Sequence, residues 1–399
     1  MSPAGPAVRV LLVDDSAVIR HFVTGALEQE PDIVVAATAP NGRIALDKLA
    51  AELPDVVVLD IEMPELDGLA TLRALRPRWP DLPVVMYSTL TARGATATLD
   101  ALSAGATDYV LKPSHLGDPE AASRAVRDEL APVLRSWGTF QRARRDAGRP
   151  RPASAPGADD AAPAAHVPFR APAASPELPR PGPSVPGAHV PVLAATRSGR
   201  SARPDAVVIG SSTGGPQALT ELVPNLPGSL GVPVLVVQHM PPLFTRLLAE
   251  RLDARSALHV VEAVAGTEVV AGNVYVAAGG THLVVRRRGA TVVTAVDDGP
   301  PENSCKPSVD VLFRSAAAIY GPRVLAVVLT GMGQDGLEGC RSVQASGGAV
   351  YAQDEATSGV WGMPGAVARA GLAHQVLGLD DIAPAIARSL ARPLTEAHA

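Results

Sequence analysis

Residues 8–15 have the sequence VRVLLVDD, an apolar run that ends in two aspartates. Four further apolar runs follow, at residues 32–38, 55–60, 82–88 and 106–113. Amphipathic stretches come after these runs and begin near Ser16, Gly42, Gly68, Arg93 and Pro119. This alternation is typical of a parallel sheet that helices cover on both faces. The sequence therefore predicts a five-stranded α/β domain over residues 8–136.

A break in composition follows this predicted domain. The hydrophobic periodicity ends after about Phe140, and twelve prolines lie between Pro150 and Pro191 among alanine, glycine and serine. Such a stretch cannot bury enough apolar surface to offset the entropy lost on ordering, and proline favours an extended chain. We expect residues 137–203 to form a linker, with a proline-rich ligand for another module as the alternative.

The second half of the chain repeats the alternation. Apolar runs at residues 206–210, 232–240 and 324–333 are each followed by a stretch with helical signals. Residues 259–294 are less regular and contain turn signals, so we expect an antiparallel insertion there. The sequence predicts a second, doubly wound α/β domain with a β insertion over residues 204–392.

Composition restricts the class of protein. The 399 residues carry 35 basic and 40 acidic side chains, and the net charge of -5 gives no global attraction to nucleic acid or to an anionic membrane. The C-terminal half lacks a helix-turn-helix pattern, which disfavours DNA binding. Two cysteines are too few for a disulfide framework, and no apolar run is long enough for a membrane span. We expect a cytoplasmic protein that binds no nucleic acid and does not insert into membranes.

Three carboxylates are expected at one edge of the first sheet. Asp14 and Asp15 end the first predicted strand and Asp60 ends the third, and the carboxyl ends of parallel strands meet at one edge. Converging carboxylates repel one another unless a cation lies between them, and oxygen ligands suit Mg²⁺. Ser88 and Lys112 end the fourth and fifth strands, so a hydroxyl and an ammonium group lie at the same edge. An acyl phosphate on Asp60 would find its counter-charges in place.

The motifs VDDS, DIEMPELDG, YST and YVLKP make residues 8–135 resemble a response-regulator receiver domain. The resemblance implies a flavodoxin-like sheet, with Asp60 as the phosphoacceptor and a chemotaxis histidine kinase as the phosphodonor. It implies that Mg²⁺ is bound by Asp14, Asp15, Asp60 and the backbone carbonyl of Glu62. It gives switch roles to the hydroxyl of Ser88, the aromatic ring of Tyr109 and the ammonium group of Lys112. Such a receiver is a two-state element that phosphate contacts bias.

Residues 210–215, GSSTGG, directly follow a predicted strand and open a helix. As a phosphate-binding loop, the segment lacks the lysine of a P-loop and the glycine spacing of a dinucleotide fingerprint. As a bare tight turn, it needs no chemistry. As a nucleophile turn, it fits G-x-S-x-G with Ser212 in the centre, and the following helix would offer backbone N–H groups to an oxyanion.

A nucleophilic serine needs a base, and His239 is the candidate because it ends a predicted strand at the same sheet edge as Ser212. Asp335 follows a third predicted strand and is expected to orient the imidazole. Asp297, Asp298 and Asp310 are less well placed alternatives. Among the other histidines, we expect surface residues at His166, His189, His282 and His398. We expect satisfied core residues at His259 and His374.

The chain order of serine, histidine and aspartate differs from that of α/β-hydrolases. The motifs IGSSTGGP, VVQHMP, ENSCKPSVDVLF and VLTGMGQDG make residues 203–392 resemble the catalytic domain of chemotaxis-type protein-glutamate methylesterases. The resemblance implies that Ser212 is the nucleophile, His239 the general base and acid, and Asp335 the residue that orients the imidazole.

The same resemblance places Thr213 and Met332 beside the oxyanion site and implies no cofactor in this domain. Cys305 and Lys306 depart from the histidine-arginine pair of many relatives. The implied function is phosphorylation-regulated hydrolysis of glutamate γ-methyl esters, and deamidation of glutamines, on the cytoplasmic domains of chemoreceptors. The alternatives are a paralogous methylesterase, or a phospho-gated scaffold, in a signalling pathway other than chemotaxis.

Overall fold

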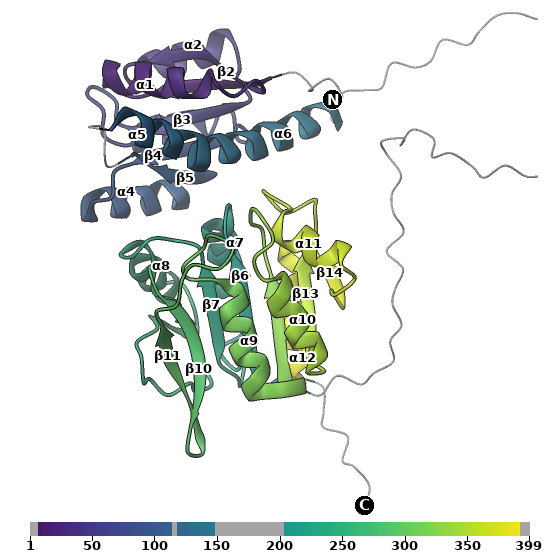
Figure 1. The fold of residues 1–399 in the computed structure, drawn as a ribbon. Helices are drawn as coiled ribbons and strands as arrows, with labels where there is room; N and C mark the ends of the chain where they lie inside the picture. Colours follow the sequence, from purple (N-terminus) through teal and green to yellow (C-terminus); the bar gives the residue numbers. More distant parts are fainter. Residues whose placement is uncertain (1–6, 114–117, 148–202, 392–399) are drawn as a thin grey trace, which may run out of the picture.

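A computed structural model of the chain describes residues 7–113, 118–147 and 203–391. These residues form two α/β units that stack on each other (Figure 1). Most of the predicted linker lies outside the described residues. None of the helices in the described ranges combines the length and hydropathy that a membrane span requires.

The first unit has the predicted five-stranded parallel sheet, in the order β2-β1-β3-β4-β5. Its strands are β1 (Val8–Val13), β2 (Ile33–Ala39), β3 (Val56–Asp60), β4 (Val84–Ser88) and β5 (Asp108–Leu111). The first four helices are α1 (Ala17–Leu27), α2 (Gly42–Ala51), α3 (Gly68–Leu75) and α4 (Ala92–Ser103). Each of these helices starts after a polar residue whose side chain accepts a backbone N–H bond, which explains why the predicted starts were close.

The last helix of this unit extends beyond the predicted boundary at residue 136. Helix α5 (Pro119–Ala125) continues through a π-helical turn, η1 (Val126–Leu130), into α6 (Ala131–Ala147). Trp137 in α6 is buried and belongs to the same hydrophobic cluster as Val8 and Leu12 of β1. The helix therefore continues because its apolar face packs on the sheet, whereas the sequence prediction relied on the loss of periodicity nearby.

The second unit has a seven-stranded sheet in the order β14-β13-β12-β6-β7-β9-β8, in which every neighbouring pair is parallel. Its strands are β6 (Ala206–Ser211), β7 (Val234–Gln238), β8 (His259–Glu262), β9 (Asn273–Val276), β12 (Val324–Val328), β13 (Ala349–Gln353) and β14 (Gln375–Leu377). The strand order reverses between β6 and β12, which makes a crevice at the carboxyl ends of these strands.

The expected antiparallel insertion is smaller than predicted. Only β10 (His282–Arg288) and β11 (Thr291–Asp297) form an antiparallel hairpin, whereas β8 and β9 extend the main sheet in parallel. Turn signals mark the ends of strands but do not show which partner a strand pairs with, so residues 259–276 were wrongly grouped with the hairpin.

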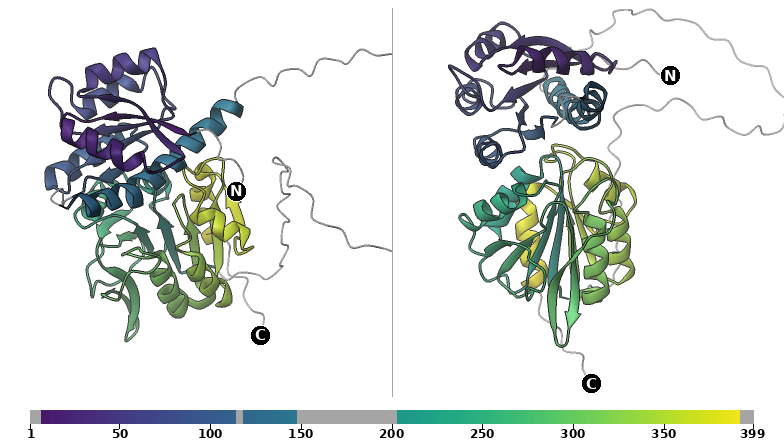
Figure 2. Two further views of the ribbon diagram at one scale, coloured as in Figure 1. Left: turned by 45° about the horizontal axis from the view of Figure 1, so that its top comes forward. Right: turned by 60° about the vertical axis from the view of Figure 1, so that its left-hand side comes forward.

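Helices cover both faces of the second sheet (Figure 2). One face carries α7 (Gly215–Leu222), α8 (Phe244–Asp253) and α12 (Leu379–Ala391). The other carries α9 (Val309–Tyr320), α10 (Leu337–Ala345) and α11 (Met363–Arg369). Two short 3-10 turns complete the unit: η2 (Val223–Asn225) leads into a loop, and η3 (Gly321–Arg323) leads directly into β12.

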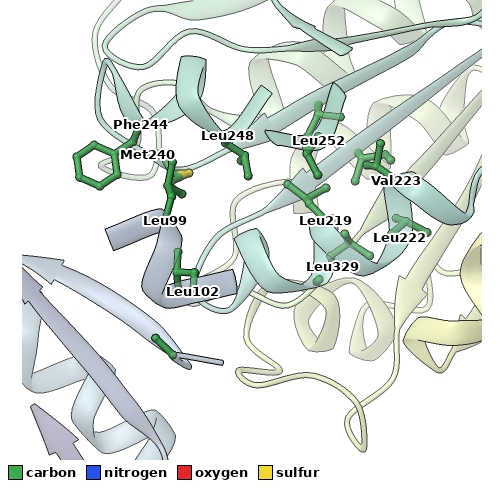
Figure 3. Packing of buried hydrophobic residues seen from close by; sticks show 14 of the residues in the cluster. Leu99, Leu102, Leu219, Leu222, Val223, Met240, Phe244, Leu248, Leu252 and Leu329 are labelled. Atoms are coloured by element: carbon green, nitrogen blue, oxygen red, sulfur yellow. The ribbon is translucent and has the colours of Figure 1, made fainter. Parts of the chain in front are cut away.

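The two units are in contact through α4 and α8. Leu99 and Leu102 of α4 belong to one buried cluster with Met240, Phe244 and Leu248 of the second unit (Figure 3). This shared apolar cluster holds the first unit over the carboxyl edge of the second sheet, which is the edge where the sequence predicts the serine and histidine.

Substitution of Gly68, at the start of α3, tests the packing of the first unit directly. A Cβ at this position would lie 2.1 Å from the Asp60 carbonyl oxygen, which the backbone fixes. We expect Gly68→Ala to destabilise the first unit by about 1–3 kcal/mol, because overpacking against backbone cannot relax. Gly25 in α1 has no atom within 4 Å of the corresponding position. Gly25→Ala should therefore stabilise the unit by about 0.5–1 kcal/mol. Urea unfolding measures both effects, and equal effects of the two variants would contradict this packing.

Candidate active site and phosphoacceptor site

The three predicted catalytic residues follow the strands that flank the reversal point. Ser212 directly follows β6, His239 directly follows β7, and Asp335 lies in the loop between β12 and α10. The Ser212 N–H donates to the Thr330 carbonyl at 3.0 Å, and the His239 N–H donates to the Ser211 carbonyl at 3.1 Å. These backbone bonds fix the three loops against one another at one edge of the sheet.

Asp335 is the most constrained group of the site, because six hydrogen bonds reach its buried carboxylate. The imidazole Nε2 of His239 lies 2.8 Å from Oδ2, which also accepts the Val309 N–H at 2.7 Å. The donors to Oδ1 are Asn303 Nδ2, Ser308 Oγ and the N–H groups of Asp310 and Gly336. Burial alone would raise the pKa of Asp335, but the hydrogen bonds from His239 and the backbone outweigh it and lower that pKa. The carboxylate is therefore ionised and fixed in position.

The imidazole of His239 is more basic than an ordinary histidine. Burial favours its neutral form, but the hydrogen bond to Asp335 and the neighbouring Cys305 thiol outweigh burial and raise its pKa to about 9. Since Nε2 faces Asp335, the nitrogen left for proton transfer is Nδ1.

Ser212 and His239 line one cavity of about 500 Å³. Within the described part of the chain, the Ser212 hydroxyl has no hydrogen-bond partner, whereas the Ser212 carbonyl accepts the N–H of Gly215 at 2.7 Å and Nε2 of Gln238 at 3.0 Å. Ser211 Oγ in turn donates to Gln238 Oε1 at 2.8 Å. The backbone of the serine is thus held and its hydroxyl is free to rotate, as is common before a substrate binds.

Of the two predicted neighbours of the oxyanion site, Thr213 and Met332, only Thr213 lines the cavity. The carbonyl of Thr213 accepts the Thr330 hydroxyl at 2.9 Å. Met332 does not line the cavity, and its side chain packs against the hydrophobic cluster of the first unit. Gly331, the residue before Met332, packs on the serine, because a Cβ there would come within 2.9 Å of the Ser212 Cβ. Only glycine allows this loop to approach the serine so closely.

Gln238, Asn303 and Ser308 support the site but were not predicted from the sequence. Three other histidines also differ from the predictions. His282 was expected on the surface, but it is 2% exposed and its Nδ1 accepts the Ser308 N–H at 3.1 Å. His259 was expected among core residues, but it is exposed and pairs with Asp253. His374 was also expected among core residues, but it is exposed, although its Nδ1 accepts the Val350 N–H at 3.1 Å.

The first unit brings the predicted acidic cluster together. Carboxylate oxygens of Asp14, Asp15 and Asp60 lie within 4.8 Å of one another. The ammonium group of Lys112 lies 2.8 Å from both Asp14 Oδ2 and Asp60 Oδ1. Burial raises the pKa of Asp60 to about 6, although Lys112 opposes this shift. The excess of negative charge over the single lysine, and the all-oxygen donor set, fit a hard cation such as Mg²⁺.

The other predicted receiver residues lie around this cluster. Glu62 and the buried Ser88 line the same cavity as Asp60 and Lys112. Ser88 Oγ donates only weakly, to the carbonyls of Thr89 at 3.3 Å and Gly94 at 3.4 Å. Its hydroxyl can therefore exchange these long bonds for a stronger acceptor.

The first unit forms one wall of the cavity that contains Ser212 and His239. Tyr109 of β5 lines it and stacks on Phe244 of α8, with ring centroids 5.0 Å apart. The buried carboxylate of Asp108 accepts from Trp137 Nε1 at 3.2 Å and from the backbone N–H of Gly214, beside Thr213. Arg251 of α8 donates to Asp100 Oδ1 at 2.6 Å and to the Thr96 carbonyl at 3.1 Å. These contacts hold the first unit against one side of the cavity.

Comparison with known proteins identifies both units. The family described as CheB methylesterase matches residues 207–386, and the response regulator receiver domain matches residues 10–122. A protein-glutamate methylesterase/protein-glutamine glutaminase of Nocardioides sp. is 49% identical over 387 residues, which cover 97% of this chain and 96% of that protein. A protein of the same name from Trichodesmium erythraeum is 41% identical and covers 96% of this chain and 99% of its own. The CheB methylesterase catalytic domain of Thermotoga maritima is 44% identical over 47% of this chain and 99% of its own, with a TM-score of 0.46.

The basicity of His239 can be measured by NMR titration of its ring. We expect a pKa of about 9, so that the imidazole stays protonated until the pH rises through that value. In Cys305→Ser the thiol is lost and the pKa of His239 should fall, although the hydrogen bond to Asp335 continues to raise it. Cys340, which is buried in α10, is the matched control, and Cys340→Ala should leave the titration unchanged. A His239 pKa that is the same in Cys305→Ser and the unsubstituted protein would contradict the described contact.

Proposed function

The chain belongs to the CheB methylesterase family and is a protein-glutamate methylesterase/protein-glutamine glutaminase regulated by a receiver domain, and from this premise we propose that Ser212, His239 and Asp335 perform its chemistry. The observation that carries this assignment is the hydrogen bond of 2.8 Å between His239 Nε2 and the fixed Asp335 carboxylate, at the mouth of a cavity that Ser212 also lines.

In the proposed reaction, the Ser212 hydroxyl attacks the ester carbonyl of a methylated glutamate while His239 Nδ1 takes its proton. Only the neutral form of the imidazole can act in this way, so the raised pKa of His239 predicts that activity rises with pH up to about 9. Asp335 remains ionised and stabilises the imidazolium ion that forms. The proton then passes from His239 to the departing methoxide, which leaves as methanol. A glutamyl ester remains on Ser212. Water, deprotonated by the same imidazole, hydrolyses this ester and restores the serine. With glutamine as the substrate, the leaving group is ammonia.

The negative charge on the attacked carbonyl needs hydrogen-bond donors. We assign this role to backbone N–H groups near Thr213 and Met332, because Thr213 lines the cavity next to Ser212 and the loop of Met332 packs on the serine through Gly331. Helix α7 begins at Gly215, and the positive end of its dipole favours an oxyanion there. Met332 contributes through its backbone in this proposal, since its side chain packs on the receiver.

The substrates in this proposal are methylated glutamates and glutamines on the cytoplasmic helices of chemoreceptors, so the protein acts in the cytoplasm. The receiver implies a phosphodonor kinase. We propose that this donor is a chemotaxis histidine kinase and that Asp60 accepts the phosphoryl group. We also propose that the first unit, which α6 extends from the expected boundary at residue 136 to Ala147, and residues 204–392 act as domains joined by the segment between them.

Mg²⁺ in the receiver would be held by Asp14, Asp15, Asp60 and the carbonyl of Glu62, which lie at or around the described acidic cluster. When bound, it would neutralise charge on the phosphoryl group. Lys112 already pairs with Asp14 and Asp60, so it is placed to bind a phosphoryl oxygen once Asp60 is phosphorylated.

We propose that the unphosphorylated receiver inhibits by covering the cavity, and that the switch passes through Ser88 and Tyr109. A phosphoryl group on Asp60 offers the Ser88 hydroxyl a better acceptor than its present long bonds. Movement of Ser88 makes room for the ring of Tyr109, which then leaves Phe244. Tenfold to hundredfold activation requires about 1.4–2.7 kcal/mol of coupling, a usual value for such an interface.

Replacement of the nucleophile tests the proposed chemistry. We expect Ser212→Ala to lower methanol release from methylated receptor membranes by a factor on the order of 10⁶, because residual catalysis comes from binding alone. Ser211→Ala is the matched control. It removes the hydroxyl's hydrogen bond to Gln238 and its longer bond to the Val237 carbonyl, so its loss should be about tenfold or less. If Ser212→Ala lost no more activity than Ser211→Ala, Ser212 would not be the nucleophile.

Replacement of Arg251 tests the proposed inhibition. Arg251→Ala removes the contacts from α8 to α4, and it should raise the activity of the unphosphorylated protein several-fold, up to about tenfold. Arg246 is the matched control, since it lies on the same helix and pairs with Glu250 of that helix rather than with α4. Asp60→Asn should abolish activation by a phosphodonor, and Arg251→Ala should still activate in that background. An unchanged or lower activity of Arg251→Ala, in protein that remains folded, would rule out inhibition by this contact.

A further inference from the structure

Cys305 is a thiol in the active site for which the proposed reaction has no use. It lies in the loop between β11 and α9, where its backbone forms an isolated antiparallel β-bridge with Glu302. Its side chain is half-buried and is not in a disulfide. It lines the same cavity as Ser212 and His239. A thiol next to a catalytic imidazole, at the mouth of a cavity, is accessible to small ligands as well as to substrate.

The thiol, the imidazole and the Asp335 carboxylate form a compact cluster. One ligand atom from each of His239, Cys305 and Asp335 lies within 4.8 Å of the other two. In a tetrahedral zinc site, with bonds of about 2.3 Å to sulfur and about 2.0–2.1 Å to nitrogen, ligand atoms lie roughly 3.5 Å apart. The cluster thus needs only a small contraction, which a side chain on a loop such as Cys305 allows.

The role of Asp335 in this cluster follows from its hydrogen bonds. Its carboxylate already accepts six donors and holds His239 through Nε2, so it is not free to turn towards a metal. Histidines that bind metals commonly donate their second ring N–H to a carboxylate, which fixes the ring and makes it a better ligand. Asp335 therefore fits the role of the outer partner, and Nδ1 of His239 and Sγ of Cys305 fit the role of direct ligands.

Charge and ligand type favour a soft or borderline divalent cation. A thiolate and the ionised Asp335 together carry two negative charges in a partly buried site, and one dication balances them. Sulfur and imidazole nitrogen favour Zn²⁺ strongly over Mg²⁺, which prefers oxygen ligands such as those of the receiver. Metal binding would release one proton from the thiol and, from a protonated ring, a second.

We propose that His239 and Cys305 form a zinc-binding site in the catalytic cavity, with Asp335 as the outer partner, through which zinc inhibits the hydrolase. Zinc on Nδ1 occupies the lone pair that must accept the Ser212 proton, so a metal-bound enzyme cannot start the reaction. Inhibition rests on the proposed function of Ser212, whereas zinc binding does not depend on it.

Cobalt(II) is the probe for binding, because a cobalt-bound thiolate gives a charge-transfer band in the near ultraviolet. The full-length Ser212→Ala protein, with excess Mg²⁺ to saturate the receiver, should show this band when cobalt is added and lose it when zinc displaces the cobalt. A further Cys305→Ala substitution should abolish the band, whereas Cys340→Ala should retain it. Absence of the band, or its persistence in Cys305→Ala, would overturn the proposal.

A second arm measures inhibition of methanol release by zinc in protein with the native Ser212. Each variant is compared with its own metal-free rate, so that changes in basal activity cancel. Cys305→Ala and Cys305→Ser should each require at least about tenfold more zinc for half inhibition than Cys340→Ala does. Equal inhibition of all three would refute inhibition through this site. If cobalt binds as predicted but the native protein releases no methanol, the zinc site stands and the proposed function fails.

Discussion

The active site depends on one constraint, the burial of the Asp335 carboxylate at 1% exposure. A carboxylate at this depth is stable only if donors satisfy it, and its donors come from the loop 303–310 as well as from its own loop. The same carboxylate holds His239, which follows a different strand. One buried charge therefore fixes three loops that are distant in the sequence, and the crevice between β6 and β12 takes its shape from them.

The receiver uses the same geometry on a smaller scale. Its sheet order also reverses between β1 and β3, so Asp14 and Asp60 meet at the carboxyl edge, where Lys112 binds both. The two units contact each other through the apolar cluster of α4 and α8 and the stacked rings of Tyr109 and Phe244. A change at Asp60 therefore has a short physical route to the cavity of Ser212, through residues that pack rather than through the linker.

The sequence was sufficient to predict the residues that directly follow strands. Ser212, His239 and Asp60 end apolar runs, and parallel strands bring such residues to one edge whatever the loops do. The sequence was not sufficient to predict hydrogen-bond partners whose position depends on the conformation of a loop. Asn303 and Ser308 reach Asp335 from a loop without periodicity, and the burial of His282 results from the packing of the hairpin.

The central claim is that Ser212, His239 and Asp335 act as one unit. Rates of methanol release for the alanine variants, alone and combined, test it most directly. Residues that act as a unit are not additive, so adding His239→Ala or Asp335→Ala to Ser212→Ala should cost no further activity. Losses that multiply from one variant to the next would show that the three side chains act independently, and would contradict the account.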